Sequence, residues 1–200
     1  MSDELLAYAR AFVPAKDLAA FDAGDEEVYA KALSQWMTNP ELADRIVKWA
    51  GISGYVLEPS CGLKALSNAA TNAHADVTTV DIDPQFEPDI CRNFLECEFN
   101  ANFNWGLTNP PFEGGMDGKV LERLAFYSDE VVAIIRLAAL SGSGRWEQLW
   151  QHVSVGGLIV LKNRPSFDLV RRKTGSPRHD FCIVKFSAYK VYETSKVEWW

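Results

Sequence analysis

The sequence predicts an α/β fold in which a doubly wound, mostly parallel sheet ends in an antiparallel last strand. The main observation is that short apolar segments alternate along the chain with segments of helical spacing. Residues 131–135 form a continuous apolar run, which is typical of a strand covered by helices on both faces. No helical pattern separates the last two predicted strands, 158–161 and 181–186, so the last strand should pair antiparallel.

The elements follow one another in a regular order. Thr38 is expected to cap the first helix of the main domain, because Pro40 suits the first turn and Glu41 completes a capping box. Gly51 ends that helix. The other strands are expected at 55–57, 77–80 and 105–108, and the other helices at 64–72, 120–127 and 146–153.

The N-terminal residues 1–34 are Ala-rich and acidic. Their apolar spacing predicts two short helices with a break near Ala23 and Gly24. We expect this segment to cap a domain that spans residues 35–200, with Trp199 and Trp200 forming a packed tail.

Composition limits the classes of protein that fit. The chain has 200 residues, of which 48% are hydrophobic, and a net charge of −7, which argues against coating nucleic acid by bulk charge. No apolar run is long enough to span a membrane, and the acidic N-terminus differs from a signal peptide. The four cysteines lack zinc-ligand spacing. We therefore expect reduced thiols, no metal site, no membrane association and a cytoplasmic location.

Three predicted strands end on polar residues, Glu58, Asp81 and Asn109. Ligands of open α/β sheets bind beyond the carboxyl ends of the strands, so these side chains are candidates for one crevice. Glu58 opens a turn through Gly62 whose backbone N–H groups suit a polar or cationic ligand, although an ordinary βα turn fits too. Asp81 lies 19 positions after Gly62, where an acidic residue commonly binds ribose; a capping aspartate is the alternative.

The segment Asn109-Pro110-Pro111-Phe112 is the strongest signal. Two consecutive prolines stiffen the chain and remove two backbone donors, which leaves neighbouring carbonyls free to accept hydrogen bonds. The Asn109 carboxamide adds an acceptor, and Phe112 adds a flat ring. Acceptors beside a stacking ring suit a planar group that carries an NH₂, such as adenine, whereas the alternative is a rigid Pro-Pro turn.

Together these motifs resemble those of the S-adenosylmethionine-dependent amino-methyltransferases, and among them the DNA adenine-N6 methyltransferases. The catalytic motif of that family matches residues 109–112 without a mismatch, and its glycine and ribose motifs resemble 58–62 and 81–84. The resemblance covers about three quarters of the chain, roughly residues 36–186. It implies a Rossmann-like class I methyltransferase fold, S-adenosylmethionine as the cofactor, and methyl transfer to the N6 amino group of adenine in DNA.

The resemblance also implies roles for single residues. Asn109 and the Pro110 carbonyl would bind the target amino group, and Phe112 would stack on the target base, with Pro111 completing the catalytic motif. Glu58 would contact the methionine amino group, Asp81 the ribose, and Glu98 the amino group of the cofactor's adenine. The other cofactor-binding residues implied are Thr38, Pro59, Ser60, Cys61, Gly62, Ile82, Phe99 and Asn109.

Two departures from the family pattern affect the interpretation. Lys64 stands where the family has a second glycine, so that cofactor binding is in question. The chain also lacks the length for a separate recognition domain, but residues 164–179 hold five basic residues against one acid. We expect this loop to contact nucleic-acid phosphates, against the alternative of a solvated surface loop. Its basic residues are Arg164, Arg171, Arg172, Lys173 and Arg178.

Three functions remain open from the sequence. The first is DNA adenine-N6 methylation. The second is the same chemistry on an amino group of RNA or of a protein glutamine, because residues 109–112 suit a planar nitrogen and not one polymer. The third is a methyltransferase-like nucleic-acid-binding module in which Lys64 has impaired cofactor binding.

Overall fold

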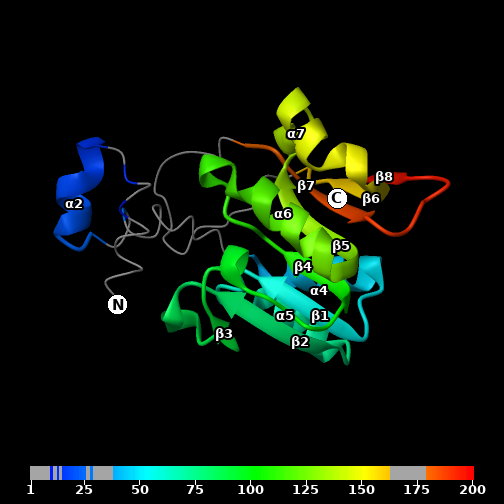
Figure 1. Ribbon diagram of the computed structural model, residues 1–200, viewed down its shortest axis with the longest axis horizontal. Coiled ribbons are helices and arrows are strands. Elements are labelled where there is room, and N and C mark those ends of the chain that lie inside the picture. The colour runs from blue at the N-terminus through cyan, green and yellow to red at the C-terminus, as the bar shows by residue number, and fades with distance from the viewer. Residues whose placement is uncertain (1–9, 11–12, 14, 26–27, 29–37, 163–178) are drawn as a thin grey trace.

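The structure is a computed structural model of the chain, and it describes residues 10, 13, 15–25, 28, 38–162 and 179–200. Its centre is an eight-stranded sheet of order β3-β2-β1-β4-β5-β7-β6-β8 (Figure 1). All strand pairs are parallel except those that β7 makes with β5 and β6. The strands are β1 (Tyr55–Pro59), β2 (Asp76–Asp81), β3 (Ile90–Cys91), β4 (Phe103–Thr108), β5 (Ser128–Arg136), β6 (Ser154–Val160), β7 (Phe181–Ser187) and β8 (Lys196–Trp199).

The predicted doubly wound, mostly parallel sheet is confirmed, and so is the antiparallel pairing of β7. Two strands were not predicted. β3 has only two residues, too few for a periodic pattern. β8 follows β7 and pairs with β6, so β7 is not the last strand. The expected packed tail is part of this edge, since Trp200 exchanges backbone hydrogen bonds with Val160 and Lys162.

Helices cover both faces of the sheet. α4 (Pro40–Ala50) and α5 (Ala65–Asn72) pack on one face, where their buried Ile46, Val47 and Leu66 join one apolar cluster. α6 (Met116–Tyr127) and the 3₁₀ turn η6 (Trp150–His152) pack on the other, where Leu121, Leu124 and Trp150 join a second cluster. α7 (Ser143–Gln148) lies beside α6 (Figure 1). This double covering explains why the strand at 131–135 is apolar on both faces.

Several predicted helices begin or end elsewhere than expected, and the helix predicted over 120–127 already begins at Met116. Asn39, not Thr38, caps α4, because its side chain accepts hydrogen bonds from the N–H groups of Glu41 and Leu42. Gly51 ends α4 in the left-handed conformation, as predicted, with a φ of 72°. The helix predicted over 146–153 is shorter: α7 ends at Gln148, and the chain continues as η6.

The described part of the N-terminal segment contains the 3₁₀ turn η1 (Ala15–Asp17) and the helix α2 (Leu18–Asp22). α2 ends just before the expected break at Ala23 and Gly24, where Gly24 has a φ of 80°. The second predicted helix falls largely outside the described residues.

Candidate active site

The strand order places the candidate site at a switch point of the sheet. The chain runs from β1 outward to β2 and β3, and then returns to the other side of β1 as β4. Crevices form at such reversals, beyond the carboxyl ends of the two central strands. Glu58 lies in β1 and Asn109 follows β4, and both line one small hollow there. Its other lining residues are Thr38, Ser60, Cys61, Gly62, Leu63, Ala65 and Leu66.

The turn after β1 has an unusual backbone. Ser60, Gly62 and Lys64 have φ values of 62°, 49° and 60°. Left-handed conformations at two residues other than glycine are uncommon, and such strained positions cluster at ligand-binding turns. Thr108 of β4 secures the start of the turn, since its hydroxyl donates to the Pro59 carbonyl at 2.8 Å.

Asp81 holds this turn against the end of β2. One oxygen of its buried carboxylate accepts the Gly62 N–H at 2.9 Å, and the other accepts the Asp83 N–H at 2.9 Å. Burial raises the Asp81 pKa, and these backbone hydrogen bonds partly oppose that effect. Asp81 is thus a structural clamp on the turn, and each oxygen retains a second lone pair that a ligand hydroxyl can use. Ile82, expected to pack on the cofactor adenine, follows at the strand end and is half-buried.

Glu58 is the least solvated acid of the hollow. Its side chain is 1% exposed, and its Oε2 atom has no hydrogen-bond partner among the described residues. Burial raises the pKa of Glu58 to about 8, opposed in part by a hydrogen bond from Ser67. Burial, together with the charges of Asp81 and Glu58, raises the pKa of the neighbouring Cys61 to about 12, so that this thiol stays protonated.

Asn109 is buried and contacts the segment before α4. Its Nδ2 donates to the Thr38 hydroxyl at 3.1 Å across 71 positions of sequence. Because Asn39 caps the helix, the Thr38 hydroxyl is available for this contact. Thr38 thus lines the hollow, and the described partner of its hydroxyl is Asn109 and not a helix end.

The diproline segment continues from Asn109 into the core. Pro110 is buried and Pro111 is half-buried. The Phe112 ring is 4% exposed and packs on Phe181 with ring centroids 5.4 Å apart. The expected stacking of this ring on a target base therefore needs a rearrangement, because the ring offers no free face in this conformation.

Lys64 points away from the hollow. Its Nζ donates to the Glu87 carbonyl at 2.6 Å, which ties the turn after β1 to the loop after β2. The sequence raised the concern that this lysine crowds the helix packing or adds charge beside a cofactor. It occupies a left-handed position at the start of α5, and its Nζ is hydrogen-bonded to the Glu87 carbonyl, although its charge still lowers the pKa of Glu58.

Glu98 and Phe99, predicted to bind the cofactor, do not line the small hollow. The Glu98 carboxylate accepts hydrogen bonds from Arg123 at 2.9 Å and Tyr127 at 2.7 Å on α6, and its side chain is 81% exposed. Phe99 packs edge-on against Phe103 and Tyr127. Asn93, which with Arg92 follows β3 at the carboxyl edge, is a polar residue whose side chain accepts the Leu95 N–H at 3.2 Å. Sequence reasoning missed it because it missed the two-residue β3.

Several expectations concern other parts of the chain. The predicted phosphate-binding residues Arg164, Arg171, Arg172, Lys173 and Arg178 all lie outside the described residues. Within the described ranges, no cluster of His, Cys, Asp and Glu has the composition of a metal site. The helices described are also too short or too polar to cross a membrane. The four cysteines are free thiols, and Cys91 alone among them is exposed.

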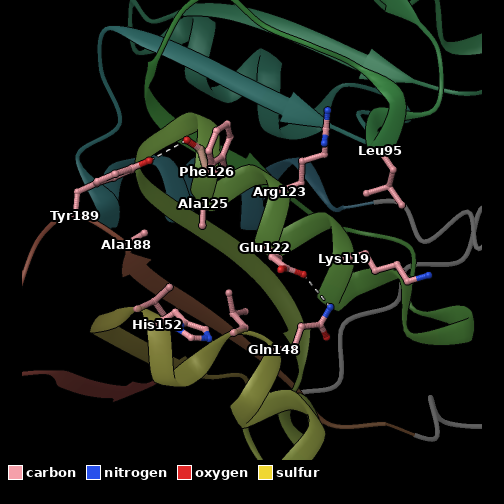
Figure 2. A pocket seen from close by; sticks show the side chains of 12 residues that line it. Leu95, Lys119, Glu122, Arg123, Ala125, Phe126, Gln148, His152, Ala188 and Tyr189 are labelled. Atoms are coloured by element: carbon pink, nitrogen blue, oxygen red, sulfur yellow. Dashed lines mark hydrogen bonds between the residues drawn. The ribbon is translucent and has the colours of Figure 1, made fainter.

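A larger cavity lies away from the strand ends. This cavity is a groove over α6 (Figure 2), and its volume is about 630 Å³. Phe126 and Tyr189 stand at one end of it, where the Tyr189 hydroxyl donates to the Phe126 carbonyl at 3.0 Å. None of its lining residues belongs to the strand-end hollow. We therefore assign the candidate site from the chemistry of the strand ends and not from the size of the cavity.

Solved methyltransferase structures share this architecture. A candidate RNA methyltransferase from Pyrococcus horikoshii aligns with a TM-score of 0.62 at 21% identity, over 80% of this chain and 89% of that chain. The 23S rRNA methyltransferase ErmE aligns with a TM-score of 0.56 at 16% identity, over 80% and 72% of the two chains. Magnesium protoporphyrin IX methyltransferase from Synechocystis PCC 6803 aligns at 0.53 and 11% identity, over 93% and 97%.

No family model and no curated protein matches the sequence. The solved structures nevertheless align with most of this chain, whose sheet is mostly parallel with β7 as its one antiparallel strand. The chain therefore has the Rossmann-like fold of class I methyltransferases.

Proposed function

We propose that this protein transfers a methyl group from S-adenosylmethionine to the N6 amino group of adenine in a nucleic acid, with DNA as the first candidate substrate. One observation carries the proposal: Glu58 and Asn109, from the two strands that flank the switch point, line the same hollow. The four-residue motif that begins with Asn109 is the feature of this sequence that most specifically resembles amino-methyltransferases.

The residues of the hollow fit the cofactor. The buried Oε2 atom of Glu58 is an acceptor suited to the ammonium group of the methionine part. The left-handed turn at Ser60 and Gly62 lines the same hollow, and we assign the ribose to Asp81, whose carboxylate is bonded to that turn at the end of the neighbouring strand. Lys64 does not line the hollow and is held by the Glu87 carbonyl, which argues against the alternative that this lysine blocks the cofactor sterically.

The cofactor supplies an electrophilic methyl group on a sulfonium. The protein's part is to present an amine nitrogen to it in line. We assign this to Asn109 and the Pro110 carbonyl, two acceptors that draw the amino hydrogens and turn the nitrogen lone pair away from conjugation with the ring. Methyl transfer would form the new N–C bond as the methyl–sulfur bond of the cofactor breaks, with S-adenosylhomocysteine as the leaving group and the amine proton passing to solvent. No protein nucleophile is needed, so positioning and electrostatics are the main catalytic contributions.

A duplex target has to leave the base stack before it enters such a hollow, whereas a single strand is already accessible. RNA is therefore the second candidate substrate. The structural similarity to RNA methyltransferases favours it specifically. The proposed phosphate contacts of residues 164–179 serve either polymer.

Methyl transfer from tritium-labelled S-adenosylmethionine tests the proposal. DNA, RNA and glutamine-containing protein are offered in parallel, and labelled nucleosides are separated after digestion. We expect label in N6-methyladenine with wild-type protein and none with Asn109→Ala, while calorimetry finds cofactor binding within about threefold of wild type. Cofactor binding without label in any adenine rejects the proposed acceptor, and absence of cofactor binding rejects the whole proposal.

A further inference from the structure

Arg136 is a basic residue at the candidate site to which the preceding argument gives no role. It is the last residue of β5, the strand that pairs in parallel with β4. Thr108 of β4 is level with Ala133 of β5, so Arg136 extends beyond the same edge of the sheet as the diproline segment. Its side chain is 24% exposed.

The guanidinium of Arg136 covers the ring of Phe112. Its Cζ atom lies 5.1 Å from the ring centroid, and its Nη2 forms an ion pair with Glu113 Oε1 at 3.2 Å. The Glu113 side chain is 50% exposed. The buried Nε of Arg136 has no hydrogen-bond partner among the described residues. The guanidinium is thus held by a solvent-accessible carboxylate and a ring face, with donor capacity unused.

We propose that Arg136 is a substrate-binding residue that yields the ring face of Phe112 to the target base and binds a phosphate of the same nucleic-acid strand. The inference rests on the proposed function, because it takes Phe112 as the residue that stacks on the base. A guanidinium and an adenine are both flat groups that stack on aromatic rings. The guanidinium therefore occupies, in the free protein, the kind of position that a base takes in the complex.

The chemistry of arginine also suits the phosphate contact that we propose for Arg136 after it leaves the ring. Once displaced from the ring, a planar guanidinium can bind phosphate oxygens through two parallel hydrogen bonds, whereas the structure describes a single contact with Glu113, at 3.2 Å. The ion pair to be given up contributes little, because the Glu113 side chain is 50% exposed. Arg136 would then link recognition of the strand to exposure of the stacking ring.

Binding of labelled oligonucleotides tests this role without any methyl transfer. Adenine-containing single strands of DNA and of RNA are titrated by fluorescence anisotropy at several salt concentrations, in the presence of S-adenosylhomocysteine. We expect Arg136→Ala to weaken binding about tenfold and to lower the slope of log affinity against log salt by about one. Arg136→Lys should keep the salt slope and lose a few-fold in affinity, because the charge stays and the paired hydrogen bonds do not.

Two further variants sharpen the result. Glu113→Gln frees the guanidinium and should tighten binding two- to fivefold. Arg45→Ala is the matched control, because the Arg45 guanidinium also lies over an aromatic ring, with its Cζ 4.2 Å from the ring centroid of Trp200. Trp200 follows β8, which is three strands away from β5 in the sheet. Arg45→Ala should leave affinity and salt slope unchanged.

The inference is overturned by an unchanged salt slope and affinity in Arg136→Ala, by weaker binding in Glu113→Gln, or by equal losses in Arg136→Ala and Arg45→Ala. Wild-type protein that binds neither strand overturns it as well. These outcomes are independent of the proposed chemistry: a protein that binds strands through Arg136 but labels no adenine loses only the proposed reaction. The preference between the DNA and the RNA strand distinguishes the two sources of phosphate.

Discussion

Replacing Glu58 with glutamine removes a carboxyl group that is 1% exposed and that has an unpartnered oxygen among the described residues. Burial raises its pKa from the ordinary value of 4.5 to about 8, while a Ser67 hydrogen bond and the charge of Lys64 offset only part of the effect. The folded protein therefore retains a proton that the unfolded chain releases above pH 4.5.

The size and sign of the effect on stability follow from these two pKa values. Below pH 4.5 the group is neutral in both states, and the stability of the folded form is unaffected. As pH rises, that stability is lost progressively until the folded group ionises near 8. At pH 7, 2.5 pH units above 4.5, the loss is about 3 kcal/mol at ~1.36 kcal/mol per unit. Glu58→Gln should remove this loss, which raises Tm by roughly 6–12 °C for a chain of this length.

Urea unfolding of the two proteins at pH 5, 6, 7 and 8 measures this difference. The curves of unfolding free energy should lie close together at pH 5 and diverge towards pH 8, with the glutamine variant more stable. Parallel curves at all four pH values would refute the argument, because they would mean that Glu58 ionises in the folded protein as it does in the unfolded chain.

The same proton is linked to the proposed cofactor. An ammonium group beside Glu58 favours the ionised acid, so cofactor binding at pH 7 should release about 0.9 proton, since the group is roughly ten-elevenths protonated one pH unit below 8. Calorimetry in two buffers of different ionisation enthalpy measures that number. Glu58→Gln should release none and should bind the cofactor more weakly. Proton release that persists in the variant would point to another group.

The remaining predictions concern neighbouring residues. Thr38→Val should lower kcat at least tenfold and leave the cofactor Kd within about threefold of wild type, because the Thr38 hydroxyl orients Asn109. Thr38→Ser keeps the hydroxyl and should restore kcat. A tenfold weaker cofactor Kd with unchanged kcat would instead make Thr38 a cofactor ligand. Asp81→Ala should weaken cofactor binding and cost about 1–3 kcal/mol in urea unfolding, because two turn N–H groups lose their acceptor; unchanged stability would contradict the clamp. Ellman's reagent at pH 8 should label Cys91 fast and the buried cysteines only on unfolding, and a second fast thiol would count against this assignment.

Local sequence patterns predicted much of the fold. The apolar run at 131–135 predicts a strand covered on both faces, and β5 has that burial. Gly51 predicts a left-handed helix end, and its φ of 72° agrees. The two strands that local patterns missed are either very short or held in place by contacts that are distant in sequence. β3 has two residues and no period to read, whereas β8 is held by pairing to β6 and by the Trp200 ring against Trp49.

The candidate site likewise has features that the sequence predicted and features that depend on the tertiary structure. The residue types at the strand ends predicted which side chains meet, and Glu58 and Asn109 line one hollow as expected. The sequence did not reveal that Phe112 is buried against Phe181, 69 positions later, because that contact depends on how β7 inserts between β5 and β6. Nor did it reveal the partners of Glu98, which lie on α6.

The sequence by itself determined the order of strands and helices and the chemistry that each strand end carries, because periodicity, turn residues and side-chain type are local properties. Only the tertiary structure decided the partners: Thr38 on Asn109, Lys64 on the Glu87 carbonyl, and Arg136 on Phe112 and Glu113. The physical reason is that a polar side chain in a crowded crevice bonds whichever group the packing brings within reach, and packing is a property of the whole sheet.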